Sequence, residues 1–275
     1  MNLEKIRKQS DSTILKFVLL GFTVAFYIGA LLAPDLNEIF SGFVRILTKP
    51  AVLTKDYFFL ELGSISGSCL NAGIIGTICC AMMFLPGMVA TGTTVAAFFL
   101  TVGFCFYGMN PLNLLPFVLG VFVYSRIKRQ PFAKFVNFAM FSTALAPLIS
   151  EVLFRYPGTE THGITLLGVA LALLIGVVTG CAMPALCAHS PGFHKGYDLY
   201  NAGPAAGFLC FLFFAVMYKT LGIEAPAIAA TLGEGNWAFV NVFCIITFAL
   251  CIVAGFFLSG KSFKGYKKVL MESGH

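Results

Sequence analysis

The longest uncharged stretch of this chain sets the main limit on its fold. No Asp, Glu, Lys, Arg or His occurs between Glu61 and Arg126. Across all 275 residues, 11% are charged and 58% are hydrophobic, whereas a soluble domain carries about 25% charged residues. So few charges cannot cover the surface of a water-soluble protein of this size. The composition therefore excludes a soluble enzyme, a disordered chain and a nucleic-acid-binding protein.

The apolar runs have the length of transmembrane helices. A spanning helix needs about 20 mostly apolar residues, whereas a membrane β-strand needs only about 10 residues of alternating polarity. The unbroken runs therefore predict an all-α polytopic membrane protein with about eight membrane segments in a single transmembrane domain, residues 1–275. We expect the segments near residues 14–33, 65–86, 89–107, 112–125, 132–150, 163–186, 199–218 and 237–258.

The distribution of Lys and Arg predicts the orientation, because these residues are enriched in cytoplasmic loops. With the N-terminus inside, the inner segments hold 13 basic and four acidic residues, and the outer segments hold five basic and eight acidic residues. The N-terminal tail 1–13 and the basic C-terminal tail 259–275 are thus both expected on the cytoplasmic side of the cell (inner) membrane. The net charge of +6 follows mostly from this topology, with membrane lipid rather than nucleic acid as the partner.

Two parts of this pattern are too short for an ordinary span. The third and fourth segments are separated only by residues 108–113, so they either cross separately or form a re-entrant hairpin that does not reach the far side. The stretch from Ile39 to Leu47 contains Arg45 and is expected to lie in the outer interface, or to dip in and return.

The cysteines and histidines do not predict a cofactor or a metal site. None of the nine cysteines forms a C-x-x-C pair, and we interpret them as small core residues. His189 and His194 share an inner loop with Asp198, which is the only local candidate for a third ligand. Pro191 and Gly192 indicate a turn between the histidines, so a solvated loop leading into a helix is the preferred interpretation.

An internal repeat brings asparagine into two apolar segments. Residues 63–76 and 192–207 share a frame of glycines around an Asn-Ala-Gly tripeptide, which begins at Asn71 and at Asn201. The charge pattern gives the two copies opposite orientations, as an inverted repeat requires. Asn in hydrocarbon is costly unless its amide finds partners, and a helix that opens at this tripeptide presents free backbone N–H groups. A pair of half-helix binding sites and simple packing through small residues are both compatible with the pattern.

A second polar group lies at the two ends of the third segment. Thr93 and Thr94 precede its apolar run, and Asn110 and Asn113 follow it. Hydroxyls and amides at both ends of a short apolar segment are what a re-entrant element needs to satisfy its backbone. An ordinary turn between two spans is the alternative.

Two carboxylates are candidates for a proton or cation site. Glu61 lies within an apolar run, and Glu151 closes the fifth segment. A membrane-embedded acid can exchange protons or bind a cation, and we assign that hypothetical role to Glu61. Both residues also lie near predicted outer boundaries, where an ionised carboxylate reaches the headgroups.

Several motifs together resemble an uncharacterised prokaryotic membrane family, the domain of unknown function 1576 family. They are Lys49-Pro50, Leu53 to Phe58, Leu70 to Gly73, Gly92 to Thr94, Gly108 to Pro116, and Gly196 to Asn201. The resemblance covers the chain from about Lys49 to the C-terminus and implies no residue roles. Members of the family run longer, so the chain resembles a truncated or shortened member.

These observations lead to a hypothesis and two alternatives. The chain is expected to be a transporter or channel for a small polar solute or ion, and a homo-oligomer is compatible with this role. Its polar groups would come from Asn71, Asn201, Thr93, Thr94, Asn110 and Asn113. A membrane-embedded enzyme acting on lipid or isoprenoid would have to use His189, His194 and Asp198. A non-catalytic assembly subunit is the third possibility.

Overall fold

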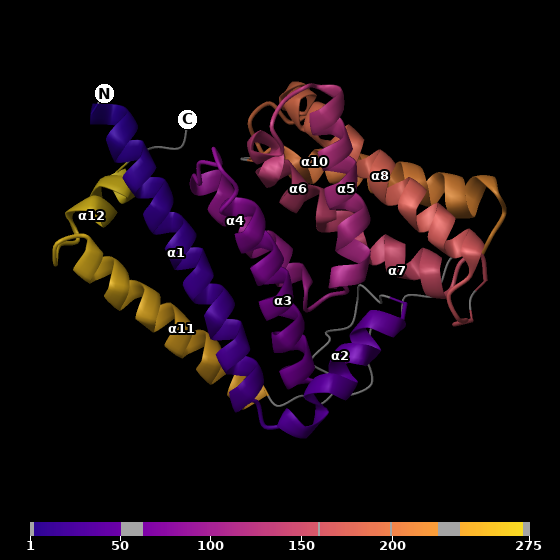
Figure 1. Ribbon diagram of the computed structural model, residues 1–275, viewed down its shortest axis with the longest axis horizontal. Helices are drawn as coiled ribbons and strands as arrows, with labels where there is room; N and C mark the ends of the chain where they lie inside the picture. The colour runs from indigo at the N-terminus through magenta and orange to yellow at the C-terminus, as the bar shows by residue number, and fades with distance from the viewer. Residues whose placement is uncertain (1–2, 51–62, 159, 199, 225–236, 272–275) are drawn as a thin grey trace. The chain divides into compact units, whose positions relative to one another are not determined.

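The computed structural model describes residues 3–50, 63–158, 160–198, 200–224 and 237–271, and all regular elements in these ranges are helical (Figure 1). The chain divides into two compact units, Met1–Glu234 and Gly235–His275. Each unit is considered by itself below.

Six helical stretches in the described ranges are long and apolar enough to cross a membrane. This confirms the prediction of a multi-pass α-helical membrane protein, and every predicted segment coincides with a helical stretch. Two of the eight, α4 (Gly92–Phe104) and α5 (Pro111–Ile127), are shorter than the rest. The six long stretches are Ser10–Leu32, Ile65–Met83, Phe132–Phe154, Leu166–His189, Ala202–Thr220 and Ala238–Leu258.

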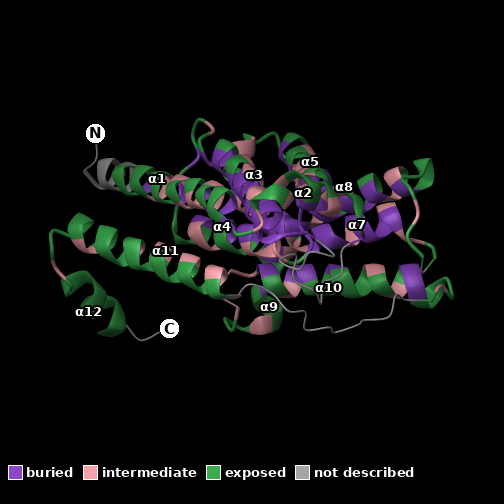
Figure 2. Cartoon of the chain, turned by 90° about the horizontal axis from the view of Figure 1, so that it is seen from below, coloured by how far each residue is buried: buried purple, intermediate pink, exposed green. Residues whose placement is uncertain are grey.

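Helices α1 (Leu3–Leu32) and α3 (Ile65–Met83) pack along each other, as Figures 1 and 2 show. A Cβ atom on Gly73 would lie 2.9 Å from Cε1 of Tyr27, so only a glycine allows this approach. The Tyr27 hydroxyl also lies 2.9 Å from Oγ1 of Thr77. Small residues and interhelical hydrogen bonds are the usual means by which helices associate in lipid, where there is no hydrophobic force between them. Helix α1 begins within the segment predicted as an N-terminal tail.

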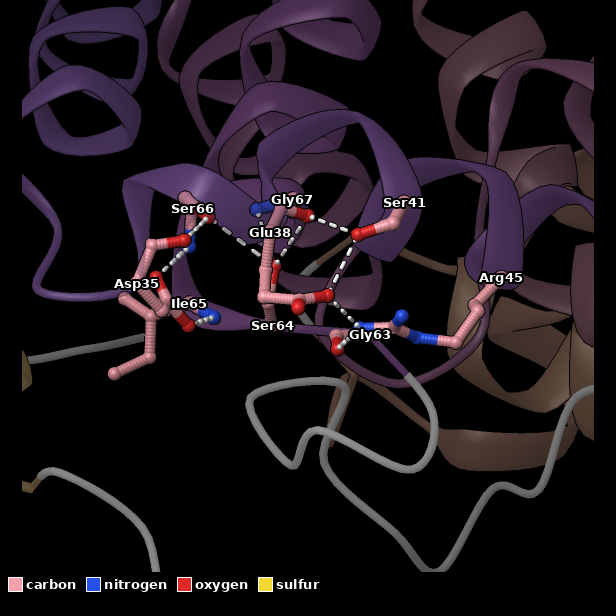
Figure 3. Close-up of polar contacts among 9 residues, drawn as sticks. All are labelled: Asp35, Glu38, Ser41, Arg45, Gly63, Ser64, Ile65, Ser66 and Gly67. Carbon is pink, nitrogen blue, oxygen red and sulfur yellow. Dashed lines mark hydrogen bonds and ion pairs between the residues drawn. The ribbon is translucent and has the colours of Figure 1, made fainter.

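A short helical corner connects α1 to α3 (Figure 3). It consists of a 3₁₀ turn, Leu36–Glu38, and α2, Ile39–Thr48, which is too short to span, as predicted. The carboxylate of Asp35 accepts hydrogen bonds from the backbone N–H groups of Ile65 at 2.7 Å and Ser66 at 2.9 Å. An acid at this position satisfies two of the free N–H groups of α3 and is favoured by the positive end of the helix dipole.

Glu38 is the centre of the charged contacts in this corner (Figure 3). Its Oε2 accepts hydrogen bonds from the Ser41 hydroxyl at 2.6 Å and from Nη2 of Arg45 at 3.0 Å. The same Arg45 nitrogen donates to the carbonyl of Gly63 at 2.7 Å, which ties α2 to the residues before α3. The Ser41 hydrogen bond, followed by that of Arg45, lowers the pKa of Glu38.

Removing the Ser41 hydroxyl is expected to change the acid limb of the stability profile. Because the folded state lowers the pKa of Glu38, its contacts stabilise the protein above the unfolded pKa of about 4.3. This contribution disappears as the pH falls through the folded pKa. In Ser41→Ala the folded pKa lies nearer the ordinary value, so the loss of thermal stability in detergent on acidification should be smaller than in the parent and should level off at a higher pH. Superimposable profiles for the parent and Ser41→Ala would contradict the assigned contact.

The fifth predicted segment is a broken helix. It consists of a 3₁₀ turn (Phe132–Phe135), α6 (Val136–Ser142), a second 3₁₀ turn (Thr143–Leu145) and α7 (Ala146–Phe154). Pro147 lies in the first turn of α7, where its missing N–H is tolerated. The break therefore occurs inside a stretch that otherwise has the length of a span.

The rest of the first unit packs around α8 (Leu166–His189). Helix α8 lies along α5, and α9 (Pro191–His194) leads from it to α10 (Ala202–Phe214). Helix α10 continues as a π-helix, Ala215–Thr220. Buried residues, purple in Figure 2, are concentrated in α3 and α7 of this unit.

The second unit contains α11 (Trp237–Leu258) and α12 (Lys264–Met271). Within this unit none of the described side chains of α11 is buried, and apart from Asn241 and Thr247 they are apolar or small. A helix that is hydrophobic all round is typical of a membrane span.

Candidate functional site

Three of the predicted asparagines meet in one buried polar cluster. It lies where the turn between α4 and α5 contacts α3. Asn71 comes from α3, Asn110 precedes α5 and Asn113 lies in the first turn of α5. All three have no exposed surface in the protein. We call these three residues the asparagine cluster.

Asn110 and Asn113 form a reciprocal cap at the start of α5. The side-chain oxygen of Asn110 accepts hydrogen bonds from the N–H groups of Leu112 and Asn113, both at 3.0 Å. The side-chain oxygen of Asn113 accepts from the Asn110 N–H at 2.8 Å. Its amide nitrogen donates to the carbonyl of Gly108 at 2.7 Å and to the Ser150 hydroxyl of α7 at 2.8 Å. This arrangement satisfies the N–H groups that a helix start would otherwise bury without partners.

Asn71 binds backbone carbonyls of the same turn. Its Nδ2 donates to the carbonyls of Cys105 at 3.1 Å and Met109 at 2.8 Å. Carbonyls only accept, so these two contacts determine which side of the amide carries the nitrogen. Its Oδ1 is buried and has no hydrogen-bond partner among the residues that the structure describes. A buried acceptor without a donor is costly, so this oxygen needs an explanation.

Contacts at both ends of the α4–α5 pair show which other helices lie beside it. At the beginning, the Ser12 hydroxyl accepts from the Ala90 N–H at 2.8 Å, and Lys16 donates to the Met88 carbonyl at 2.7 Å, so the connection before α4 lies beside the early part of α1. At the turn, Asn71 lies six residues, about 9 Å, beyond the first residue of α3.

Helix α2 covers the turn between α4 and α5. Nδ2 of Asn110 donates to the carbonyl of Ile46 in α2 at 3.1 Å. The 13 residues of α4 extend about 20 Å, against about 30 Å for the hydrocarbon core. These features favour the hairpin interpretation of α4 and α5 over two separate complete spans.

The predicted threonines lie at the other end of α4. Thr94 is buried, and its Oγ1 accepts from the Thr91 N–H at 3.0 Å, so it caps the helix. Thr93 is exposed. Neither has a hydrogen bond to the asparagine cluster among those identified in the described residues.

Asn201 lies in a different environment from Asn71. It adopts a left-handed conformation, φ 62°, immediately before α10, and its Oδ1 lies 2.8 Å from Nε2 of His194. Nδ1 of His194 accepts from the N–H groups of Gly196 and Asp198, so the ring holds the loop together. This pattern uses both ring nitrogens within the loop and agrees with the structural interpretation of these residues.

The two copies of the repeat start differently. The expectation that a helix opens at the tripeptide holds at Asn201, where α10 begins at Ala202, but it is wrong at Asn71. Helix α3 begins at Ile65 because Asp35 caps its first turn, and it continues through Asn71. Glycines of the first copy pack against neighbouring helices, whereas a Cβ on Gly207 would meet nothing within 4 Å.

Of the two predicted carboxylates, Glu61 lies outside the described residues. The second, Glu151 at the end of the fifth segment, is buried in the protein. Glu151, on α7, is 7% exposed, and its Oε1 lies 3.4 Å from Nε of Arg155. The i, i+4 spacing was the sequence signal for this pair. Among the described residues, no group of three or more His, Cys, Asp or Glu side chains is arranged to hold a metal ion.

Six helical stretches of membrane-spanning length and two shorter apolar helices in the described ranges define the chain as a polytopic α-helical membrane protein. A family model described as "Protein of unknown function (DUF1576)" matches residues 35–219. The chain belongs to this family, as the sequence motifs predicted. Searches of curated proteins and of solved structures gave no match.

Proposed function

We propose that this protein is a membrane transporter or channel for a small polar solute or ion, and that its solute contacts Oδ1 of Asn71. The observation that carries the proposal is this buried acceptor, which has no hydrogen-bond partner within the described part of the chain, on a side chain whose nitrogen is held by two carbonyls. Its partner must be a hydrogen-bond donor or a cation, because the oxygen can only accept. In transporters, solute sites are commonly formed where helices are interrupted inside the membrane.

Two interruptions support this location. The α4–α5 turn supplies backbone carbonyls at Cys105, Gly108 and Met109, and the broken fifth segment supplies Ser150 through its hydrogen bond to Asn113. Irregular backbone at membrane depth is tolerated where it is buried in protein or lines a water-filled cavity. The same proposal includes the inverted repeat, solute contacts at Asn201, Thr93 and Thr94, and a proton or cation site at Glu61.

The test is solute entry into proteoliposomes after an osmotic upshift, followed by light scattering. Urea, glycerol, glycine and sodium chloride serve as probes of neutral, zwitterionic and ionic solutes. We expect faster re-swelling than in empty liposomes for at least one probe, and about a tenfold loss of that rate in Asn71→Leu, equivalent to one hydrogen bond. Rates equal to those of empty liposomes for all four probes would contradict transport of these classes.

A matched control separates loss of the site from loss of the fold. Thr101 is a buried polar residue of α4 whose hydroxyl donates only to backbone carbonyls, at Ala97 and Met140. Thr101→Val preserves its shape and should leave the rate unchanged. Asn71→Leu combined with Asn201→Leu tests the predicted pair, and an unchanged rate in a folded double variant would remove both residues from the site.

A further inference from the structure

The end of α11 and the start of α12 form a hydrogen-bonded corner. The Lys261 N–H donates to the Phe256 carbonyl at 2.9 Å, while Gly260 and Lys261 both adopt positive φ angles, 71° and 58°. The Phe256 and Phe263 rings lie with their centroids 4.9 Å apart. Oγ of Ser262 accepts from the Lys264 N–H at 3.2 Å. A span that stops in such a turn redirects the chain at the membrane surface, and α12 begins at once after it.

Helix α12 separates its charged and apolar side chains onto two faces. Lys264, Lys267 and Lys268 have i, i+3, i+4 spacing and therefore share one face. Tyr266, Val269 and Leu270 have the same spacing, offset by two residues, and share the opposite face. Those three apolar side chains are 64–67% exposed within the unit Gly235–His275.

The charge of this segment has one sign. No Asp or Glu occurs from Gly235 to Met271, whereas Lys261 adds a fourth ammonium group to the three lysines of α12. An exposed apolar face beside a basic face, directly at the end of a membrane span, is complementary to the headgroup region of an anionic bilayer. Lysine stems reach outward to phosphate while the apolar face lies against the acyl boundary.

We propose that α12 is an interfacial helix that binds anionic phospholipid headgroups. Tyr266, Val269 and Leu270 enter the acyl boundary, and Lys264, Lys267 and Lys268 contact the phosphates. The site depends on neither the asparagine cluster nor the proposed transport. The charge pattern of the whole chain assigns it to the cytoplasmic leaflet.

The experiment uses the full chain with one tryptophan moved onto the apolar face. The protein contains a single tryptophan, so Trp237→Phe combined with Tyr266→Trp creates a reporter on α12. One preparation is divided between liposomes of phosphatidylcholine and liposomes that also contain phosphatidylglycerol. We expect a larger blue shift, and stronger quenching by headgroup-proximal brominated lipid, in the phosphatidylglycerol liposomes. Both differences should shrink as salt is added.

The lysines are tested in the same reporter background. Replacing Lys264, Lys267 and Lys268 together by Gln should abolish the difference between the two lipids, whereas replacing Lys128, Lys134 and Lys195 by Gln should retain it. A misfolded preparation cannot account for the expected result, because the same protein is compared in both lipids. Emission and quenching that are equal in the two lipids would overturn the proposal. If the new tryptophan instead becomes better protected from the brominated lipid as more protein is reconstituted per liposome, the apolar face contacts a second copy of the chain. That result would also overturn the proposal.

Discussion

Gly180→Ala is expected to lower the free energy of unfolding by about 2–3 kcal/mol, although it adds a single methyl group. A Cβ on Gly180 would collide with the carbonyl oxygen of Phe117 and lie 2.8 Å from Cα of Gly120. Both are backbone atoms of α5, so no flexible side chain can move away, and α5 and α8 would have to separate. Unfolding in detergent, followed by circular dichroism, measures the loss.

Gly21→Ala is the matched control for this prediction. Gly21 is also inside a long apolar helix, but a Cβ there would meet nothing within 4 Å. Alanine favours a helix over glycine by about 1 kcal/mol, so this variant should be as stable as the parent or more stable. Equal losses in the two variants would show that the α5–α8 contact does not govern the effect.

Asn113→Leu is expected to cost at least about 3 kcal/mol, because three buried groups lose their partner at once. These are the Asn110 N–H, the Gly108 carbonyl and the Ser150 hydroxyl. Leucine has the same branching and the same number of side-chain heavy atoms as asparagine, and its methyl groups are larger than the amide groups, so the substitution leaves no cavity. The folded turn would loosen, and solute entry in the proteoliposome assay should fall with stability.

Asn137→Leu makes the same chemical change at a site without this network. Asn137 lies on α6, and its Oδ1 is buried with no hydrogen-bond partner in the described ranges. Removing an unsatisfied buried oxygen should leave stability unchanged or raise it. If the midpoints of thermal unfolding fell equally for Asn113→Leu and Asn137→Leu, the asparagine cluster would not be the source of the stability.

The 3₁₀ turn inside the fifth segment was not predicted from the sequence. Residues 132–150 were expected as one span because hydropathy reports only the length of an apolar run. The turn at Thr143–Leu145 leaves that length almost unchanged. Pro147 was the available signal, because a proline cannot donate a hydrogen bond to the carbonyl four residues earlier, here that of Thr143, and its ring clashes with that carbonyl.

The candidate site was predictable by residue type but not by partner. Asn71, Asn110 and Asn113 were selected because amides in hydrocarbon require partners. Which amides lie together depends on how α3, the α4–α5 turn and α7 pack. The hydrogen bonds from Asn71 to Met109 and from Asn113 to Ser150 join residues that are 38 and 37 positions apart in the chain. The repeat suggested that Asn201 would join them, but its amide is engaged by His194 in the loop before α10.

A multi-pass helical membrane protein of the DUF1576 family, with its helices in these places, follows from the amino-acid sequence. Both conclusions depend on local properties, because the length of an apolar run and the spacing of motifs can be read along the chain. The packing of the helices was needed to show that three asparagines share one buried cluster and that the Oδ1 of Asn71 has no donor among the described residues. Hydrogen bonds in a low-dielectric interior depend on ångström distances between helices remote in sequence, and no local pattern specifies those distances.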